Sequence, residues 1–137
     1  MKRMPSDWIT RRDCNKPLQI KMLDKSFSDI PAGATMLVVT PKLMDKFIRQ
    51  IPSGETVEQP AIRKALAGKY GAEYACPVTT GIALRVVSEA AYLELLNGLD
   101  ESDVTPFWRA VTPDGTLALK LACGRSFLET MRRKERA

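Results

Sequence analysis

Apolar residues recur at helical spacing in several segments of this chain. The clearest segment follows Pro41, where apolar side chains return every three or four positions at Leu43, Met44, Phe47, Ile48 and Ile51. This spacing places them on one face of a helix, and proline is favoured in the first turn of a helix. We therefore predict a helix that begins at Pro41 and ends at the Pro52-Ser53-Gly54 turn.

Two further helices, over residues 59–69 and from Pro77 to the residue before Asn97, are predicted to form a helix-turn-helix. The glycines of the 68–71 stretch break the first helix. The second helix is apolar on most sides and carries one polar stripe at helical spacing, formed by Arg85, Ser88, Glu89 and Tyr92. This pattern indicates a core helix with one exposed face.

The remaining patterns predict a small β-hairpin and a last helix. Residues 36–40 form a short apolar run that fits a strand or an extended segment. Residues 106–119 fit two short strands joined by a turn at Pro113-Asp114-Gly115. From about residue 124 to 136, apolar and basic side chains separate onto two faces of a helix. The predicted fold class is mainly α with a small hairpin.

Composition divides the chain into a basic N-terminal extension, residues 1–35, and a domain over residues 36–137. The extension is weakly patterned and carries seven basic residues, Lys2, Arg3, Arg11, Arg12, Lys16, Lys21 and Lys25. The net charge of +5 and the pI of about 9.3 are compatible with a nucleic-acid partner.

Residue types argue against several classes of protein. The chain has no histidine, which removes the commonest general base, and it has no Cys-x-x-Cys pair for zinc. Three widely spaced cysteines do not suggest a disulfide framework. No apolar run is long enough to span a bilayer, and the N-terminus lacks the apolar block of a signal peptide. We expect a cytoplasmic protein that is not an enzyme, with no metal, no cofactor and no membrane partner.

The segment that begins at Pro106 resembles the active-site segment of a known family. Pro106-Phe107-Trp108-Arg109, followed by Ala110-Val111 and a turn containing Gly115, is similar to the Pro-Cys-His-Arg motif of the O6-alkylguanine-DNA alkyltransferases, the methylated-DNA-protein cysteine methyltransferase family. The segment 51–57 resembles the one that leads into that family's helix-turn-helix, and Cys123-Gly124 stands where the family has a Gly-Gly pair. The resemblance covers about residues 41–136 and implies a winged-helix-like domain.

The departures from this motif change the expected chemistry. Phe107 stands where the family has its methyl-accepting cysteine, and Trp108 stands where it has histidine. A phenyl ring cannot accept an alkyl group, and Glu135 has no histidine to orient. In these departures the chain resembles the alkyltransferase-like proteins, which bind alkylated DNA without repairing it. The resemblance implies non-catalytic binding of double-stranded DNA, with alkylated guanine as a candidate lesion in DNA repair.

The resemblance also implies roles for individual residues. Thr79, Thr80 and Arg85 are expected to face the DNA groove, and Gln59 occupies the position of a tyrosine that helps the family rotate a nucleotide. Arg109 is expected to brace the hairpin through backbone carbonyls and to adjoin the DNA.

Phe107 and Trp108 are expected to line the former alkyl pocket. Because neighbouring strand residues face opposite sides, one ring should join the core while the other faces a cleft; burial of both rings is the alternative. On this basis Arg85→Ala should weaken DNA binding, whereas Phe107→Ala should change only the preference for a lesion.

Two other functions remain open. The scaffold could be a module that binds a protein or a small ligand and has lost nucleotide flipping. Alternatively, Cys76 could be a reactive thiol, because it precedes Pro77 at a predicted helix N-terminus, where the helix dipole lowers a thiol pKa. A small buried cysteine is the structural alternative for that position.

Overall fold

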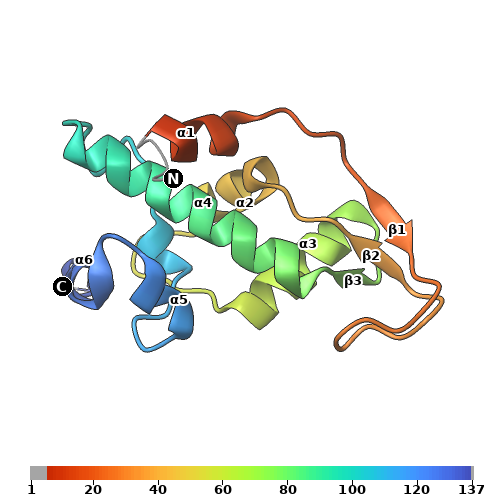
Figure 1. Cartoon of the computed structure of the whole chain (residues 1–137). Coiled ribbons are helices and arrows are strands. Elements are labelled where there is room, and N and C mark those ends of the chain that lie inside the picture. Colours follow the sequence, from red (N-terminus) through yellow and green to blue (C-terminus); the bar gives the residue numbers. More distant parts are fainter. Residues whose placement is uncertain (1–5, 137) are drawn as a thin grey trace.

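The structure is a computed structural model that describes residues 6–136, and it is mainly helical with a small sheet (Figure 1). Residues 1–5 of the predicted extension and residue 137 of the predicted domain lie outside the described residues. The elements in chain order are α1 (Ser6–Asp13), β1 (Ile20–Met22), β2 (Thr35–Leu37), α2 (Pro41–Arg49), α3 (Gln59–Tyr70), β3 (Tyr74–Ala75), α4 (Pro77–Leu96), the 3₁₀ turn η1 (Phe107–Arg109), α5 (Thr116–Lys120) and α6 (Gly124–Arg136).

Helix α4 runs through the middle of the molecule, and α1, α2, α3 and η1 all pack against it (Figure 1). Its inner residues, Leu84, Val87 and Ala91 among them, belong to the main hydrophobic core. This burial explains why α4 is apolar on most sides, as the sequence indicates, since a helix surrounded by other elements cannot keep a wide polar face.

The predicted pair of helices is present as α3 and α4. Helix α3 buries Ile62 and Leu66 and ends at Gly71, whose φ of 79° suits the left-handed position that terminates a helix. The short strand β3 and Cys76 then lead into α4. The helices predicted from Pro41 and Gly124 are confirmed as α2 and α6.

The sheet has three short strands in the order β1-β2-β3. Strand β1 pairs antiparallel with β2, with Ile20 opposite Leu37, and β2 pairs parallel with β3, with Met36 opposite Tyr74. The apolar run at residues 36–40 therefore begins as a strand and continues as an extended lead into α2. The sheet joins the N-terminal part of the chain to the connection between α3 and α4.

The hairpin predicted for residues 106–119 is wrong. Its first half is the turn η1, in which the amides of Arg109 and Ala110 bond to the carbonyls of Pro106 and Phe107. Its second half is the short helix α5, which buries Ala118. The turn between them is present, because the Gly115 amide bonds to the Thr112 carbonyl at 3.0 Å. The antiparallel strand pair lies instead at β1 and β2.

Residues 6–35 join the rest of the molecule through α1, the pairing of β1 with β2 and a few side chains, while most of residues 13–29 are exposed. Helix α1 lies along α4, where Arg12 is buried and bonds to both carboxylate oxygens of Glu94, at 2.6 and 3.2 Å. The long connection between β1 and β2 is held to α3 by a two-bond contact between Arg63 and Asp29, at 2.8 and 3.0 Å. These two ion pairs add to a small apolar cluster in which Ile30 and Ala34 of this segment pack with Met36 and Cys76.

Candidate nucleic-acid interface

A cavity of about 450 Å³ lies beside the first half of α4. Its walls come from α1, the start of α3, α4 and α5, through Trp8, Arg11, Gln59, Val78, Gly81, Ile82, Arg85, Val86, Thr116, Leu117 and Lys120. Three of these residues are cations, Arg11, Arg85 and Lys120, and none is a carboxylate. We call this hollow the cationic cavity. Three positive charges brought together from distant parts of the chain create a local attraction for anions.

Arg85 lines the cationic cavity and contacts three of its neighbours. Its guanidinium carbon lies 5.4 Å from the centroid of the Trp8 ring, and that of Arg11 lies 5.2 Å from the same ring. Nη2 of Arg85 is 3.5 Å from the Lys120 carbonyl oxygen, and Nε is 3.8 Å from a Glu89 oxygen. These contacts hold the side chain at the cavity wall, yet it keeps 40% of its surface exposed. Arg85 can therefore reach an incoming anion.

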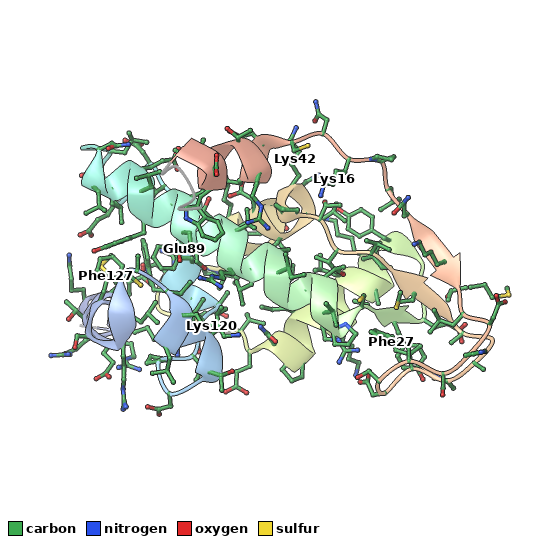
Figure 2. All side chains as sticks on the ribbon, viewed as in Figure 1. Lys16, Phe27, Lys42, Glu89, Lys120 and Phe127 are labelled. Atoms are coloured by element: carbon green, nitrogen blue, oxygen red, sulfur yellow. The ribbon has the colours of Figure 1, made fainter. Side chains whose placement is uncertain are left out.

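Glu89, one turn after Arg85, is a buried carboxylate on α4 that faces the corner between α5 and α6 (Figure 2). One of its oxygens accepts a hydrogen bond from the Ala122 amide at 3.1 Å. This bond fixes the corner next to Lys120, the cation that α5 contributes to the cationic cavity. Glu89 thereby links α4 to the segment between α5 and α6.

Cys123 lies half-buried at the same corner. Burial, with a smaller contribution from the negative charge of Glu89, raises the pKa of its thiol from 9.0 to about 11. The burial of the thiol contributes stability that is complete below pH 9.0 and is lost as the pH rises through about 11. At neutral pH the side chain is a thiol and a poor nucleophile.

Cys14 and Cys123 should differ in their rates of alkylation, because Cys14 is exposed whereas burial raises the pKa of Cys123. With iodoacetamide at pH 7.5, the exposed Cys14 should be alkylated first, while Cys123 should react more slowly by about tenfold or more. The rate at Cys123 should rise about tenfold for each pH unit up to its pKa. Peptide mass spectrometry over a time course measures both rates. Equal rates at neutral pH would contradict the placement of Cys123.

Gln59 and Arg85, two of the residues proposed from the sequence, are brought together in the cationic cavity. Thr80 is not available to a groove, because it is fully buried and donates its hydroxyl to the Cys76 carbonyl at 2.6 Å. Thr79 accepts a hydrogen bond from the Val39 amide at 3.0 Å and so ties α4 to the strand β2 segment. The two threonines brace the start of α4, which corrects the expectation that both face DNA.

The side chains that the start of α4 does expose are apolar. Val78 and Ile82, one turn apart, each have about half of their surface exposed and line the cationic cavity. Cys76 caps the helix: its sulfur accepts a hydrogen bond from the Thr79 amide at 3.5 Å, and the residue is buried. The structure thus gives Cys76 the role of a small buried cysteine.

Phe107 and Trp108 both lie in the hydrophobic core, which fits the alternative that both rings are buried, not the expectation that only one joins the core. Trp108, 2% exposed, also borders a hollow of about 460 Å³ that Met131 and Glu135 of α6 line with it. Their ring centroids are 5.5 Å apart, and the Phe107 ring stacks on Phe127 of α6 at 5.9 Å and 10°. The expectation assumed a strand, whose side chains alternate, whereas the turn η1 directs both rings inward. Neither ring lines the cationic cavity.

Arg109 joins three segments through its guanidinium. It donates to the Ile51 carbonyl at 2.7 Å and makes a two-pronged contact with Glu135 of α6, in which the shortest distance is 2.7 Å. Both side chains are only 15% exposed. Hydrogen bonds from Arg109 are the main cause that lowers the pKa of Glu135. Glu135, which has no histidine to orient, thus orients Arg109 instead. The pair joins η1 to α6 and to the Ile51 segment.

A second cavity of about 300 Å³ adjoins the first and shares Gln59, Thr116 and Leu117 with it. It reaches the residues directly after η1, Ala110 and Val111, and its other walls include Glu58, Pro60, Leu84, Thr112 and Gly115. We call it the inner cavity. It lies beside the segment that resembles the alkyltransferase motif, although the aromatic pair itself is turned away into the core.

Sequence reasoning missed Trp8, Arg11 and Lys120 as members of the site. The basic character of residues 1–35 was a signal for Arg11, but nothing in the spacing places it near Arg85. Lys120 was missed because it is the residue directly after the predicted hairpin, and the sequence did not predict the helix α5 that ends there. Their convergence is a property of the packing of α1, α4 and α5.

Comparison with family models, with curated proteins and with solved structures found no match for this chain. Among residues 6–136, no helix is long and apolar enough to cross a membrane. The same described residues contain no group of three or more histidine, cysteine, aspartate or glutamate side chains that could hold a metal ion.

Proposed function

We propose that this protein binds double-stranded DNA through the exposed face of the first half of α4, at Val78 and Ile82, and through the cationic cavity, without transforming the DNA. The observation that carries the proposal is the convergence of Arg11, Arg85 and Lys120 beside α4, the second helix of the α3–α4 pair, with no carboxylate in the cavity wall. Cations in this position can neutralise phosphates while the helix approaches a groove.

The surface of α4 favours binding with little sequence preference. Bases are read mainly through hydrogen bonds from arginine, lysine and amide side chains in the major groove. The exposed start of α4 offers Val78 and Ile82, whose contacts are limited to thymine methyl groups and sugar edges, and only Gln59 supplies an amide nearby. We therefore expect phosphate contacts to provide most of the affinity.

We propose no reaction on DNA because Phe107 occupies the position of the methyl-accepting cysteine in the alkyltransferase motif. Phe107 holds no transferable or accepting group, and its ring is fully buried in the core. The chain also has no histidine to act as a base. Any effect on damaged DNA would therefore come from holding it.

We extend the proposal to alkylated guanine because of the inner cavity. Its volume of about 300 Å³ is at the lower end of the range for small-molecule sites. Its wall combines apolar side chains, Leu84, Val111 and Leu117, with the polar groups of Gln59 and Thr116. Such a wall suits a base that carries an added alkyl group, which the resemblance to the alkyltransferase-like proteins also favours.

The test is a titration of duplex DNA at several salt concentrations. Lys120→Ala should weaken binding and reduce the salt slope by about one, because it removes one phosphate contact. Lys120 is a suitable probe, since its side chain is exposed and the contact from Arg85 is to its backbone carbonyl, which alanine keeps. Arg85→Ala should have a similar effect, with thermal unfolding as a check that the fold is kept.

The matched control is Lys46→Ala, which removes the same charge from an exposed site on α2 outside the cationic cavity. An equal loss of affinity in both lysine variants would show that only net charge matters and would contradict the proposed interface. Duplexes with and without a single O6-methylguanine test the extension. Equal affinity for the two would remove alkyl recognition but leave DNA binding in place.

A further inference from the structure

The outer edge of strand β1 carries a row of exposed apolar side chains. Ile20 and Met22 alternate with Lys21, and they are 40% and 71% exposed. Leu18, two positions before Ile20, is 54% exposed. Figure 1 shows β1 at the outside of the sheet, away from the helices. Within the described part of the chain, β1 packs mainly against β2.

The register shows which backbone groups of β1 are left for a partner. The Gln19 carbonyl accepts from the Val38 amide, and the Leu23 amide donates to the Ala34 carbonyl. In an antiparallel pair, residues that bond to the neighbour alternate with residues whose amide and carbonyl point outward. Lys21 lies midway between Gln19 and Leu23, so its backbone N–H and C=O groups also point toward β2. The N–H and C=O groups of Ile20 and Met22 therefore point to the free edge.

The apolar row continues the core face of the sheet. Ile20 is paired with Leu37 and Met22 with Thr35, and side chains directly opposite each other lie on the same face. Leu37 is fully buried in the main core, whereas its neighbours on β1 extend beyond the covering helices. A further strand added at β1 would bury the row and pair the outward backbone groups at the same time.

From these features we propose that the edge of β1 binds an extended segment of a partner protein, a strand that alternates apolar and acidic residues. We infer the acidic residues of the partner strand from the positive charge around this edge. Lys16, Lys21 and Lys25 are exposed around this edge, with Asp24 as the one acidic side chain among residues 16–25. The inference does not rest on DNA binding.

Other occupants fit the edge less well. A second copy paired antiparallel around β1 would place Lys21 against Lys21, and like charges directly opposite each other destabilise a sheet. A bilayer surface would accept the apolar row and the lysines, but it would leave the outward N–H and C=O groups without partners. An acidic strand satisfies the apolar, charged and backbone groups together.

The test uses two synthetic peptides of about seven residues, a typical strand length. One alternates valine with glutamate, and the other alternates valine with lysine; both carry a fluorophore for anisotropy. The full chain should bind the glutamate peptide and not the lysine peptide, and Lys21→Glu should reverse this preference. Equal binding of the two peptides, or binding of neither, would overturn the proposal.

Two variants of Ile20 separate backbone pairing from side-chain contact. Ile20→Ala shortens the side chain and keeps the outward N–H, whereas Ile20→Pro also removes that N–H, and proline is tolerated where an edge strand's N–H faces solvent. Ile20→Pro should bind the glutamate peptide about five- to tenfold more weakly than Ile20→Ala, as expected for one lost hydrogen bond. Equal affinity of the two variants would overturn strand addition.

Measurements on the unmodified chain guard against a variant that fails to fold. The glutamate peptide should slow amide exchange at Ile20 and Met22 more than at Lys21, whose amide faces β2 already. Protection confined to other residues would overturn the assignment. So would a dimer seen by ultracentrifugation that Ile20→Pro abolishes, or binding to phosphatidylglycerol vesicles that the peptide does not displace.

Discussion

Phe107→Ala should lower the free energy of unfolding by about 3–5 kcal/mol, the range for truncating a buried aromatic side chain. The Phe107 ring is fully buried, stacks on Phe127 and contacts the edge of Trp108. Its removal would leave a cavity where η1 meets α4 and α6. Urea unfolding followed by circular dichroism measures the change.

The matched control for this variant is Phe27→Ala. Phe27 is the same residue type but is exposed by 40% in the connection between β1 and β2, so its loss should cost far less (Figure 2). Similar stabilities for the two variants would contradict the packing of η1. The result also bears on function, because an effect of Phe107→Ala on DNA binding would first have to be separated from unfolding.

Arg109→Ala should be the second most damaging change, with an expected loss of about 2–4 kcal/mol. The substitution removes the bond to the Ile51 carbonyl and leaves the Glu135 carboxylate without its cation in a site that is 15% exposed. Two turns and the end of α6 would lose their common partner. Thermal and urea unfolding of the variant give the magnitude.

The pH dependence gives this prediction a second readout. The pKa of Glu135 lies below its usual 4.5 in the folded protein, so the ionised pair stabilises the fold above pH 4.5, and this stability is lost as the pH falls through the lowered pKa. Arg109→Ala should therefore lose less stability on acidification than the unmodified chain. As a control, Arg125→Ala removes an exposed arginine that contacts Asp114 and Glu129 and should change little. Parallel acid curves for the Arg109 variant and the unmodified chain would contradict the pairing.

Local patterns were sufficient to predict the larger helices. The helices that begin at Pro41, Gln59, Pro77 and Gly124 have apolar residues at helical spacing or clear start and stop residues, and these signals act over a few neighbours. Helix α1 has no such pattern, because an ion pair between Arg12 and Glu94 does part of the work that apolar contacts do elsewhere. The turn after Pro106 was not predicted because Phe107 and Trp108 pack against Phe127, which lies far away in the sequence. Patterns of neighbouring residues do not contain such long-range contacts.

The candidate site could be predicted only in part, for a related reason. Gln59 and Arg85 lie on helices that the sequence does predict, and the turn between α3 and α4 brings them together. Arg11 lies in α1, whose sequence shows no apolar periodicity. Lys120 lies in α5, a helix that the sequence did not predict. The threonines at the start of α4 were assigned to DNA by position, but their hydroxyls are already used by Cys76 and Val39.

The contact between Arg12 and Glu94 determines how this protein should be produced for experiments. A shortened version that begins at residue 36 would separate Glu94 from its arginine and remove the whole of β1 from its place beside β2. Such a fragment would expose the edge of β2 without a partner strand, and exposed strand edges favour aggregation. Assays of either proposed surface should therefore include residues 6–35 together with the rest of the chain.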